Sequence, residues 1–219
     1  MGEGHPIVET PSSLGEIPGI RALFITRLPE IDTLCERAEA MERLRPAHLA
    51  ILRERSLGNF PLVTAEQVHG NIVTSVTEAD VSAVPGSDGL ATSTKGLTLG
   101  IYVADCAPVW IVARDAHAGA LIHSGKKGTE TDIVTQGINT LRENHGVRPE
   151  DMIAVIGPCI RPPCYEIDFA KQIRQQAADA GVAEIHDAGI CTACHPGRYY
   201  SYRREKGLTG RMLATLSLV

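Results

Sequence analysis

The sequence predicts a single domain that combines β-strands with α-helices. Short apolar runs rich in β-branched residues are bounded by Gly, Asp and Pro, which is typical of buried strands. Between these runs lie segments in which apolar residues recur at helical spacing. A chain of 219 residues, 43% of them hydrophobic, is long enough to bury one good core. We therefore expect one domain, preceded by a polar, Pro- and Gly-rich arm over residues 1–19.

The first half of the chain contains the most helical part. Strands are expected at Ile20–Ile25, Phe60–Thr64 and Ile72–Val76. The apolar spacing over Ile31–Arg45 predicts an amphipathic helix, and Pro46 suits the first turn of a second helix that ends near Gly58. The last two strands bracket a hairpin-like connection with His69 at its bend.

The second half of the chain alternates strands with two helices. Strands are expected at Leu97–Val103, Pro108–Val112, Ala118–Ile122 and Met152–Ile156. The pattern over Thr129–His145 predicts a helix that Gly146 terminates. A further helix is expected to start near Asp168 as its cap and to end before Gly181.

Composition excludes several classes of function. The formal net charge of -5 argues against a large nucleic-acid footprint. No apolar run approaches the roughly 18 residues that a membrane span needs. The N-terminus lacks the basic region and apolar core of a secretory signal, so we expect a cytoplasmic protein. Six cysteines in an unexported chain of this size are more often reduced thiols or metal ligands than a disulfide framework.

Three residues whose nitrogen or sulfur atoms can bind a metal lie at the ends of the expected strands: His69, Cys106 and His123. Two imidazoles and one thiolate form a suitable zinc set that leaves a fourth position for water or substrate. From the spacing alone, a core cysteine with two turn histidines remains the simpler interpretation. Three roles are open for Asp105. It orients a metal-bound histidine, it acts as an acid or base, or it forms a turn by capping its own backbone. Asp88 is expected to form a turn.

Two further patterns lie near the C-terminus. Cys191-Thr192-Ala193-Cys194-His195 matches the C-x-x-C-H pattern of haem attachment, but attachment requires export, so we interpret it as a reduced loop thiol pair. The basic residues that follow form either an anion site or a solvated surface, and they are Arg198, Arg203, Arg204, Lys206 and Arg211. Lys126 and Lys127 are also anion candidates, although their segment lacks the spacing of an ATP-binding loop.

Several motifs follow one another in a specific order. They are Gln67-Val68-His69-Gly70, Ser87-Asp88-Gly89-Leu90, Ala104-Asp105-Cys106-Ala107-Pro108, Gly157-Pro158-Cys159-Ile160 with Tyr165-Glu166, Ser201-Tyr202-Arg203-Arg204 and Gly210-Arg211-Met212. From about Ala65 to the C-terminus, this pattern resembles the laccase-domain family. Members of that family have been called multicopper polyphenol oxidases and are now generally read as zinc-dependent purine nucleoside phosphorylases.

The resemblance implies an α+β fold of layered mixed β-sheets flanked by helices, with residues 20–219 as the catalytic domain. It implies a zinc ion held by His69, Cys106 and His123, which together with Asp105 form the expected catalytic group. The substrate-binding residues expected on the same basis are Arg27, Gln67, Lys127, Arg203 and Arg204.

The implied reaction is phosphorolysis of adenosine, inosine, guanosine or methylthioadenosine, with adenosine deamination in some members. The expected partners are therefore a purine nucleoside and phosphate, and the oligomeric state stays open. Three alternatives remain: phenol oxidation through copper, amide hydrolysis that edits peptidoglycan precursors, and a zinc-binding module whose pocket has decayed. Eight scattered histidines argue against a set of several coppers.

The sequence departs from the family pattern at two places. His123 is followed by Ser124-Gly125-Lys126-Lys127-Gly128, where the family usually has Ala-Gly-Trp-Arg-Gly. Thr26-Arg27 is followed by Leu28-Pro29 in place of a Gly-Gly-Val-Ser loop. Because lysine and arginine recognise anions differently, we expect the first change to affect substrate choice. We expect the second change to rebuild or remove part of the substrate pocket.

Overall fold

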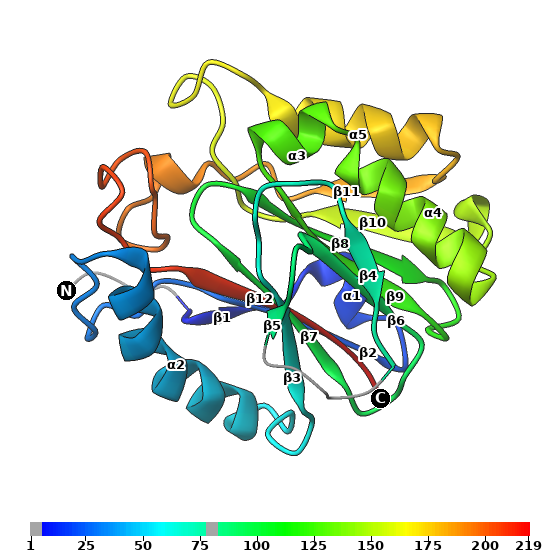
Figure 1. Ribbon diagram of the computed structural model, residues 1–219, viewed down its shortest axis with the longest axis horizontal. Coiled ribbons are helices and arrows are strands. Elements are labelled where there is room, and N and C mark those ends of the chain that lie inside the picture. Colours follow the sequence, from blue (N-terminus) through cyan, green and yellow to red (C-terminus); the bar gives the residue numbers. More distant parts are fainter. Residues whose placement is uncertain (1–5, 78–82) are drawn as a thin grey trace.

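Two six-stranded β-sheets pack face to face in the computed structural model, which describes residues 6–77 and 83–219 (Figure 1). The first sheet consists, in spatial order, of β1 (Val8–Glu9), β2 (Ile20–Ile25), β12 (Met212–Leu218), β7 (Thr98–Val103), β3 (Leu62–Ala65) and β5 (Ala83–Val84). The second consists of β11 (Glu184–Asp187), β10 (Met152–Ile156), β8 (Ala107–Ala113), β9 (Gly119–Ser124), β6 (Gly89–Thr92) and β4 (Val73–Ser75). The helices are α1 (Ser12–Gly15), α2 (Arg37–Glu54), α3 (Lys126–Glu130), α4 (Ile133–His145) and α5 (Phe169–Asp179).

Strand β8 shows why the apolar runs are unbroken. Trp110 and Val112 belong to the core between the two sheets, whereas Val109 and Ile111 belong to the core between the second sheet and its helices. The indole Nε1 of Trp110 donates a hydrogen bond of 2.9 Å to the carbonyl oxygen of Thr215 in β12, which ties one sheet to the other. Because both faces of the strand are buried, apolar and polar residues do not alternate along it.

Helices cover the outer faces of both sheets. Helices α4 and α5 pack on the second sheet, where Ile138, Leu141 and Ile173 enter its core (Figure 1). Helix α2 lies along the first sheet, and every fourth residue on one of its faces is buried: Ala40, Leu44, His48 and Leu52. The order of layers is therefore helix, sheet, sheet, helix, which confirms the expected α+β fold in a single domain.

Several predicted boundaries agree with the structure. Strands β2 and β10 have the expected limits, Ile20–Ile25 and Met152–Ile156. Gly146 ends α4 in a left-handed conformation with φ of 70°, as a glycine cap does. The side chain of Asp168 accepts a hydrogen bond of 3.0 Å from the backbone N–H of Lys171 and caps the start of α5.

The prediction of two helices on either side of Pro46 is wrong. One helix, α2, begins at Arg37 and contains Pro46 in its interior, while residues 31–36 are not helical. Proline removes one helical hydrogen bond and usually kinks or ends a helix. Here the buried face continues on both sides of the proline, through Leu44 and His48, so tertiary packing outweighs the local preference.

The expected hairpin around His69 is also wrong. Strand β3 pairs in parallel with β7 and β5 in the first sheet, whereas β4 pairs in parallel with β6 in the second sheet. The connection over residues 66–72 therefore crosses from one sheet to the other. The polar break at residues 104–106 crosses between the sheets in the same way, from β7 to β8.

The segment after His123 differs from the expected turn and helix. Helix α3 begins at Lys126, within the predicted turn, and α4 begins only at Ile133. Asp132 separates the two helices with a positive φ of 60°.

The N-terminal segment expected to be a polar arm contributes two elements to the fold. Val8 and Glu9 pair antiparallel with β2, and Leu14 of α1 is fully buried. The carboxylate of Glu9 accepts a hydrogen bond of 2.6 Å from Nε of Arg198, far along the chain. These few buried contacts within a polar segment give no periodic signal, which explains why the sequence did not reveal them. Residues 1–5 of the expected arm lie outside the described residues.

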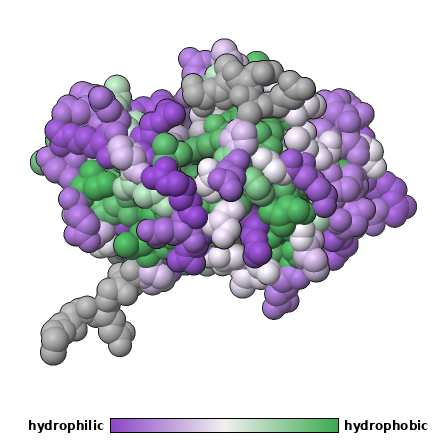
Figure 2. Space-filling view, turned by 90° about the horizontal axis from the view of Figure 1, so that it is seen from below, coloured by the Kyte–Doolittle hydropathy of each residue, from purple (hydrophilic) through white to green (hydrophobic). Residues whose placement is uncertain are grey.

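Figure 2 shows one face of the molecule, on which hydrophobic residues appear in patches between hydrophilic ones. Among residues 6–77 and 83–219, no helix has the length and apolarity needed to cross a bilayer.

Buried His48 predicts a specific dependence of stability on pH. Its ring lies 5.8 Å from that of Tyr102 between centroids, and neither ring nitrogen has a hydrogen-bond partner among the described residues. Burial lowers the pKa of His48 from 6.5 to about 4. Below about pH 6.5 the unfolded chain takes up a proton that the folded chain refuses, so stability falls between about pH 6.5 and 4 and is unaffected above this range.

We expect this histidine to account for a loss of up to about 3 kcal/mol in the free energy of unfolding across that range. Urea unfolding at pH 7 and at pH 4.5 measures the loss. The His48→Leu variant should lose less stability than the wild type on acidification, whereas His186→Leu, at an exposed position, should behave as the wild type does. Equal losses in the wild type and His48→Leu would contradict the prediction.

Candidate metal centre and substrate cavity

Sheet register brings Cys106 and His123 together. In the antiparallel pair of β8 and β9, Ala107 lies opposite Ser124, so the residue before β8 approaches the end of β9. His69 reaches the same place from the connection between β3 and β4. The ligand atoms of His69, Cys106 and His123 all lie within 4.8 Å of one another, and the two imidazole centroids are 4.9 Å apart. The structure thus assembles the three residues that the sequence predicted as metal ligands.

Asp88 fixes the two histidines of this set. The residue is fully buried. Its Oδ1 accepts hydrogen bonds of 2.9 Å from the backbone N–H of His69 and from Nδ1 of His123. Its Oδ2 accepts from the backbone N–H groups of Gly70 (2.7 Å) and Val68 (3.1 Å). Because Nδ1 of His123 donates to Asp88, Nε2 is the nitrogen left to bind a metal.

The Asp88 carboxylate also supports an unusual backbone. His69 has a positive φ of 61°, a region that residues other than glycine adopt only at a cost. The hydrogen bonds from three successive backbone N–H groups to Asp88 hold the chain in this conformation. His69 is thereby directed toward the other two ligands.

The charges of the site favour a thiolate. Burial disfavours ionisation of Cys106, but the positive charge of His123 and hydrogen bonds from both imidazoles outweigh it and lower the pKa of Cys106 to about 6. Burial likewise opposes the charged form of His123, yet the thiolate and the Asp88 carboxylate raise its pKa to about 9. For Asp88, burial is outweighed by the hydrogen bonds from His123 and the backbone, so its pKa is lowered. The thiolate is the form of cysteine that binds metals.

Gly125 lets the chain pass close to this thiol. A Cβ atom at position 125 would lie 2.5 Å from Sγ of Cys106, closer than real Cβ atoms approach other atoms. The absence of a side chain allows the backbone after His123 to turn past Cys106 and enter α3.

A cavity of about 850 Å³ opens beside the three ligands, within the range of small-molecule sites. Its basic lining residues are Arg37, Lys126, Arg203, Lys206 and Arg211. Its aromatic lining residues are Tyr102, Tyr165, Phe169 and Tyr202. The acidic residues of its wall are Glu36 and Asp105. The excess of positive charge suits an anionic ligand, and the aromatic rings suit a flat apolar group.

Asp105 lines the cavity, but its hydrogen bonds go to residues other than the ligand histidines, which one of its expected roles was to orient. Its Oδ1 accepts a hydrogen bond of 2.6 Å from Oγ1 of Thr192. Its Oδ2 accepts from Oγ of Ser201 (3.0 Å) and from the backbone N–H of Arg203 (2.8 Å). Asp105 therefore holds the loop over residues 199–211 against the cavity, while Asp88 orients the histidine.

Gln67 and Arg203 both line the cavity, as expected. The amide of Gln67 is paired with the backbone of Tyr102, donating to its carbonyl oxygen at 2.6 Å and accepting from its N–H at 2.9 Å. Gln67 thus fastens the connection that carries His69 to β7. Arg203 forms an ion pair of 3.1 Å with Glu166 and lies over the ring of Tyr165, with its side chain more than half exposed.

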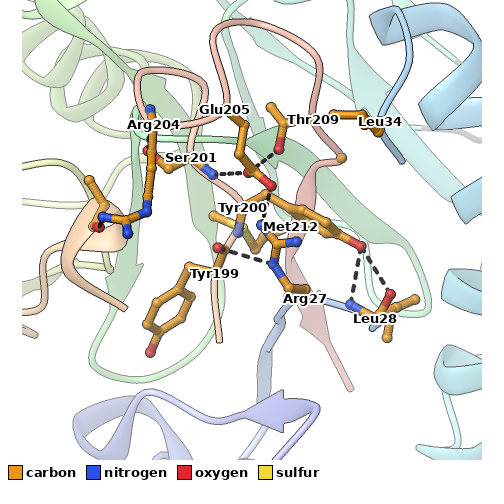
Figure 3. A network of polar contacts seen from close by, with 12 residues as sticks. Arg27, Leu28, Leu34, Tyr199, Tyr200, Ser201, Arg204, Glu205, Thr209 and Met212 are labelled. Carbon is orange, nitrogen blue, oxygen red and sulfur yellow. Dashed lines mark hydrogen bonds and ion pairs between the residues drawn. The ribbon is translucent and has the colours of Figure 1, made fainter. Parts of the chain in front are cut away.

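Arg27, which the sequence predicted to bind substrate, is not among the residues that line the cavity. Figure 3 shows its guanidinium directed at Glu205, to which NH2 donates at 2.6 Å. Its Nε donates to the carbonyl oxygen of Tyr199 at 3.3 Å, and its guanidinium lies over the ring of Tyr200. Glu205 in turn accepts from the backbone N–H of Ser201 at 3.0 Å. Arg27 therefore anchors the loop over residues 199–211 to the end of β2.

Arg204 and Lys127 are likewise outside the cavity lining. Arg204 donates through NH1 to the carbonyl oxygen of Ala193 at 3.3 Å, so its guanidinium is used to hold a neighbouring loop. Lys126 lines the cavity in place of Lys127, because successive side chains on a helix point about 100° apart.

Sequence reasoning missed several contributors to the site, among them Asp88 and Arg37. Asp88 was expected to form a turn, and the available signal was its place in the Ser87-Asp88-Gly89-Leu90 motif. Arg37 reaches the cavity because α2 folds along the first sheet, and no local pattern reveals that placement.

These features define a class of protein: a layered α+β enzyme with a two-histidine, one-cysteine donor set at the wall of a cationic cavity. The family model described as multi-copper polyphenol oxidoreductase laccase matches residues 40–170 and 166–219. The chain therefore belongs to this family of enzymes, as the order of motifs indicated. The donor set fits a metal cofactor.

Relatives and solved structures agree with this assignment. A protein of Geobacillus stearothermophilus named purine nucleoside phosphorylase YlmD is 32% identical over 198 residues, covering 71% of this chain and 72% of the relative. Purine nucleoside phosphorylase YfiH of Escherichia coli (strain K12) is 28% identical over 238 residues, covering 92% and 95%. The crystal structure of YlmD from Geobacillus stearothermophilus matches with a TM-score of 0.83 and 27% identity, over 92% of this chain and 93% of that one.

The Asp88→Asn variant should weaken metal binding. An asparagine cannot present acceptor oxygens to all four donors, so His69 and His123 lose their fixed orientation. We expect the affinity for zinc to fall by about 10- to 100-fold, measured by competition with a chromophoric chelator. Asp115→Asn is a matched control, since that exposed carboxylate also contacts Nδ1 of a histidine, His117. Unchanged zinc affinity in Asp88→Asn would show that the carboxylate does not orient the ligands.

Proposed function

We propose that this chain is a zinc-dependent purine nucleoside phosphorylase that cleaves adenosine, inosine or methylthioadenosine with phosphate. The observation that carries the proposal is the placement of His69, Cys106 and His123 at the wall of a cationic cavity. The names of the relatives from Geobacillus stearothermophilus and Escherichia coli support it.

His69, Cys106 and His123 would hold the zinc, because two imidazoles and one thiolate suit this ion and leave one coordination position open. When bound, zinc supplies a Lewis acid that polarises an oxygen or activates water. The three donors gather at one point and would hold one ion. A multicopper oxidase needs several copper sites, so this donor set favours zinc over copper.

The side chains around the cavity suit the two substrates. Lys126, Arg203 and Arg211 supply positive charge for phosphate. Tyr165 and Phe169 offer aromatic surface for a purine, and their rings already meet edge to face with centroids 6.0 Å apart. We assign catalysis to residues 20–219, against which β1 and α1 pack.

The reaction also requires charge stabilisation at the sugar. Cleavage of the glycosidic bond develops positive charge on the ribose and negative charge on the leaving base. The carboxylate of Asp105 lies in the cavity wall, held by three hydrogen bonds, and provides negative charge without a need to reorganise. Gln67 acts indirectly, since its amide secures the connection that carries His69.

The open position of the donor set also suits hydrolysis. Adenosine deamination is therefore the second activity that we propose to test on the same site, with amide hydrolysis as a further assay. All six cysteines are free thiols, which fits a cytoplasmic location, where thiols stay reduced.

Alanine substitution of each ligand tests the metal and the reaction together. His69→Ala, Cys106→Ala and His123→Ala should each lower the zinc content by about one ion per chain and abolish formation of ribose 1-phosphate from adenosine and phosphate. Metal analysis and a phosphorolysis assay on the same samples provide the measurement. His117→Ala, at an exposed histidine outside the cavity lining, serves as the control.

A wild-type protein that binds zinc but releases no ribose 1-phosphate from any of the nucleosides would reject the phosphorylase assignment. Deamination, phenol oxidation and amide hydrolysis would then be assayed on the same preparation.

Two adjacent lysines test the phosphate site. Lys126 lines the cavity and Lys127 does not, although both are exposed and lie in the same helix. We expect Lys126→Ala to raise the KM for phosphate by about tenfold, because a hydrogen bond to a charged group contributes about 1.5 kcal/mol or more. Lys127→Ala should leave it nearly unchanged. Steady-state kinetics with phosphate as the varied substrate measures the KM of each variant. An equal effect of both substitutions would reject this placement of phosphate.

A further inference from the structure

A second cluster of thiols lies outside the His69, Cys106 and His123 set. Cys164 lies in the segment between β10 and α5. Cys191 directly precedes a single 3-10 turn, Thr192–Cys194, and Cys194 is the last residue of that turn. The three sulfur atoms all lie within 4.8 Å of one another, and those of Cys164 and Cys194 are 3.3 Å apart. The sequence alone suggested only the pair in the C-x-x-C segment, because Cys164 is 27 residues away from Cys191 in the chain.

Backbone contacts hold the two segments together. An isolated parallel bridge joins Cys159 to Cys191, with Thr192 N–H donating to the Cys159 carbonyl at 3.1 Å. The thiol of Cys191 also faces the carbonyl oxygen of Arg161 at 3.8 Å. The cluster is therefore prearranged by the fold, which reduces the entropic cost of binding an ion there.

This geometry suits a tetrahedral thiolate site. Zinc–sulfur bonds of about 2.3 Å at the tetrahedral angle place two sulfur atoms about 3.8 Å apart. The sulfur atoms of Cys164 and Cys194, at 3.3 Å, are about half an ångström from that spacing, and all three lie within 4.8 Å of one another. Structural zinc sites often contain a C-x-x-C pair together with ligands from another segment, and Cys164 is such a ligand here. A disulfide would use only two of the three sulfur atoms, and all six cysteines of the chain are free thiols.

We propose that Cys164, Cys191 and Cys194 bind a second zinc ion, which links the segment before α5 to the loop that carries Cys191 and Cys194. Three thiols lose their protons to solvent and form three sulfur–zinc bonds. The fourth position belongs to water, since Cys194 is exposed and the cluster is open to solvent on its side. This site is distinct from the ligand set at the cavity and does not depend on the proposed reaction.

The second zinc would join two segments that border the cavity. Tyr165, directly after Cys164, and Phe169, at the start of α5, both line the cavity. Thr192, between the two other ligands, donates to the carboxylate of Asp105, and Ala193 accepts from Arg204. An ion at this place therefore fixes the aromatic wall of the cavity relative to the loop that carries its basic residues.

The test uses the full chain with the first site removed. In the His69→Ala/Cys106→Ala background, protein purified under reducing conditions should still bind about one zinc ion per chain, whereas the wild type should bind about two. Adding Cys194→Ala to that background should remove the remaining zinc. Cys194 is exposed, so this substitution should leave the fold intact, and circular dichroism checks it. Adding Cys35→Ala, at a cysteine outside both clusters, should change nothing.

Two spectroscopic readouts identify the ligands. Cobalt(II) bound in the same background should give the intense charge-transfer absorption of thiolate ligands, which Cys164→Ala and Cys194→Ala abolish and Cys35→Ala retains. X-ray absorption at the zinc edge should show three sulfur atoms at about 2.3 Å. Zinc should also raise the unfolding temperature of the background protein and should not raise that of its Cys194→Ala derivative.

Two outcomes overturn the proposal. The first is a background protein that retains no zinc after equilibration with the free ion while its cysteines remain titratable as thiols. The second is a disulfide between Cys164 and Cys194 in protein purified under reducing conditions, found by mass spectrometry of peptides, together with absence of bound zinc.

Discussion

The site depends on one buried carboxylate. Asp88 is fully buried, and a buried charge is costly unless its oxygens are fully hydrogen bonded. Three backbone N–H groups around His69 and the imidazole of His123 satisfy it. The same carboxylate therefore joins the connection between the two sheets to the end of β9. It also determines which nitrogen of His123 is free. The chemistry of the donor set follows from this arrangement and from the pairing of β8 with β9, which places Cys106 beside it.

Much of the fold could be predicted from local patterns. Strands such as β10 are buried on both faces, so they read as unbroken apolar runs, and caps such as Gly146 and Asp168 mark where helices end or begin. The pairing of strands could not be predicted in the same way. Whether β3 and β4 form a hairpin or enter different sheets depends on partners far along the chain, and local turn residues do not encode it. Pro46 shows the same limit, since burial of one helix face outweighs the local effect of proline.

The sequence pointed to site residues whose side chains can bind a metal and that lie at the ends of strands. It did not reveal roles that depend on contacts between distant parts of the chain. Donor type and position made His69, Cys106 and His123 candidates, the family resemblance made them the expected ligands, and the sheets bring them together. Arg27 was expected to bind substrate, and its guanidinium forms an ion pair with the carboxylate of Glu205 (Figure 3). The structure also shows what differs where the family usually has Trp-Arg and this chain has Lys126-Lys127. The first lysine lines the cavity and the second does not, so positive charge now stands where the family usually has an aromatic ring.

Diffraction at the zinc absorption edge, from crystals of the full chain grown with zinc and phosphate, tests most directly the claim that Asp88 and the sheet register build a metal centre. The account predicts an anomalous peak bonded to Nε2 of His123 and to Sγ of Cys106, at about 2.0 to 2.3 Å, with His69 completing the set and Nδ1 of His123 still donating to Asp88. The absence of a peak between these three residues, or a His123 that binds the ion through Nδ1, would contradict it.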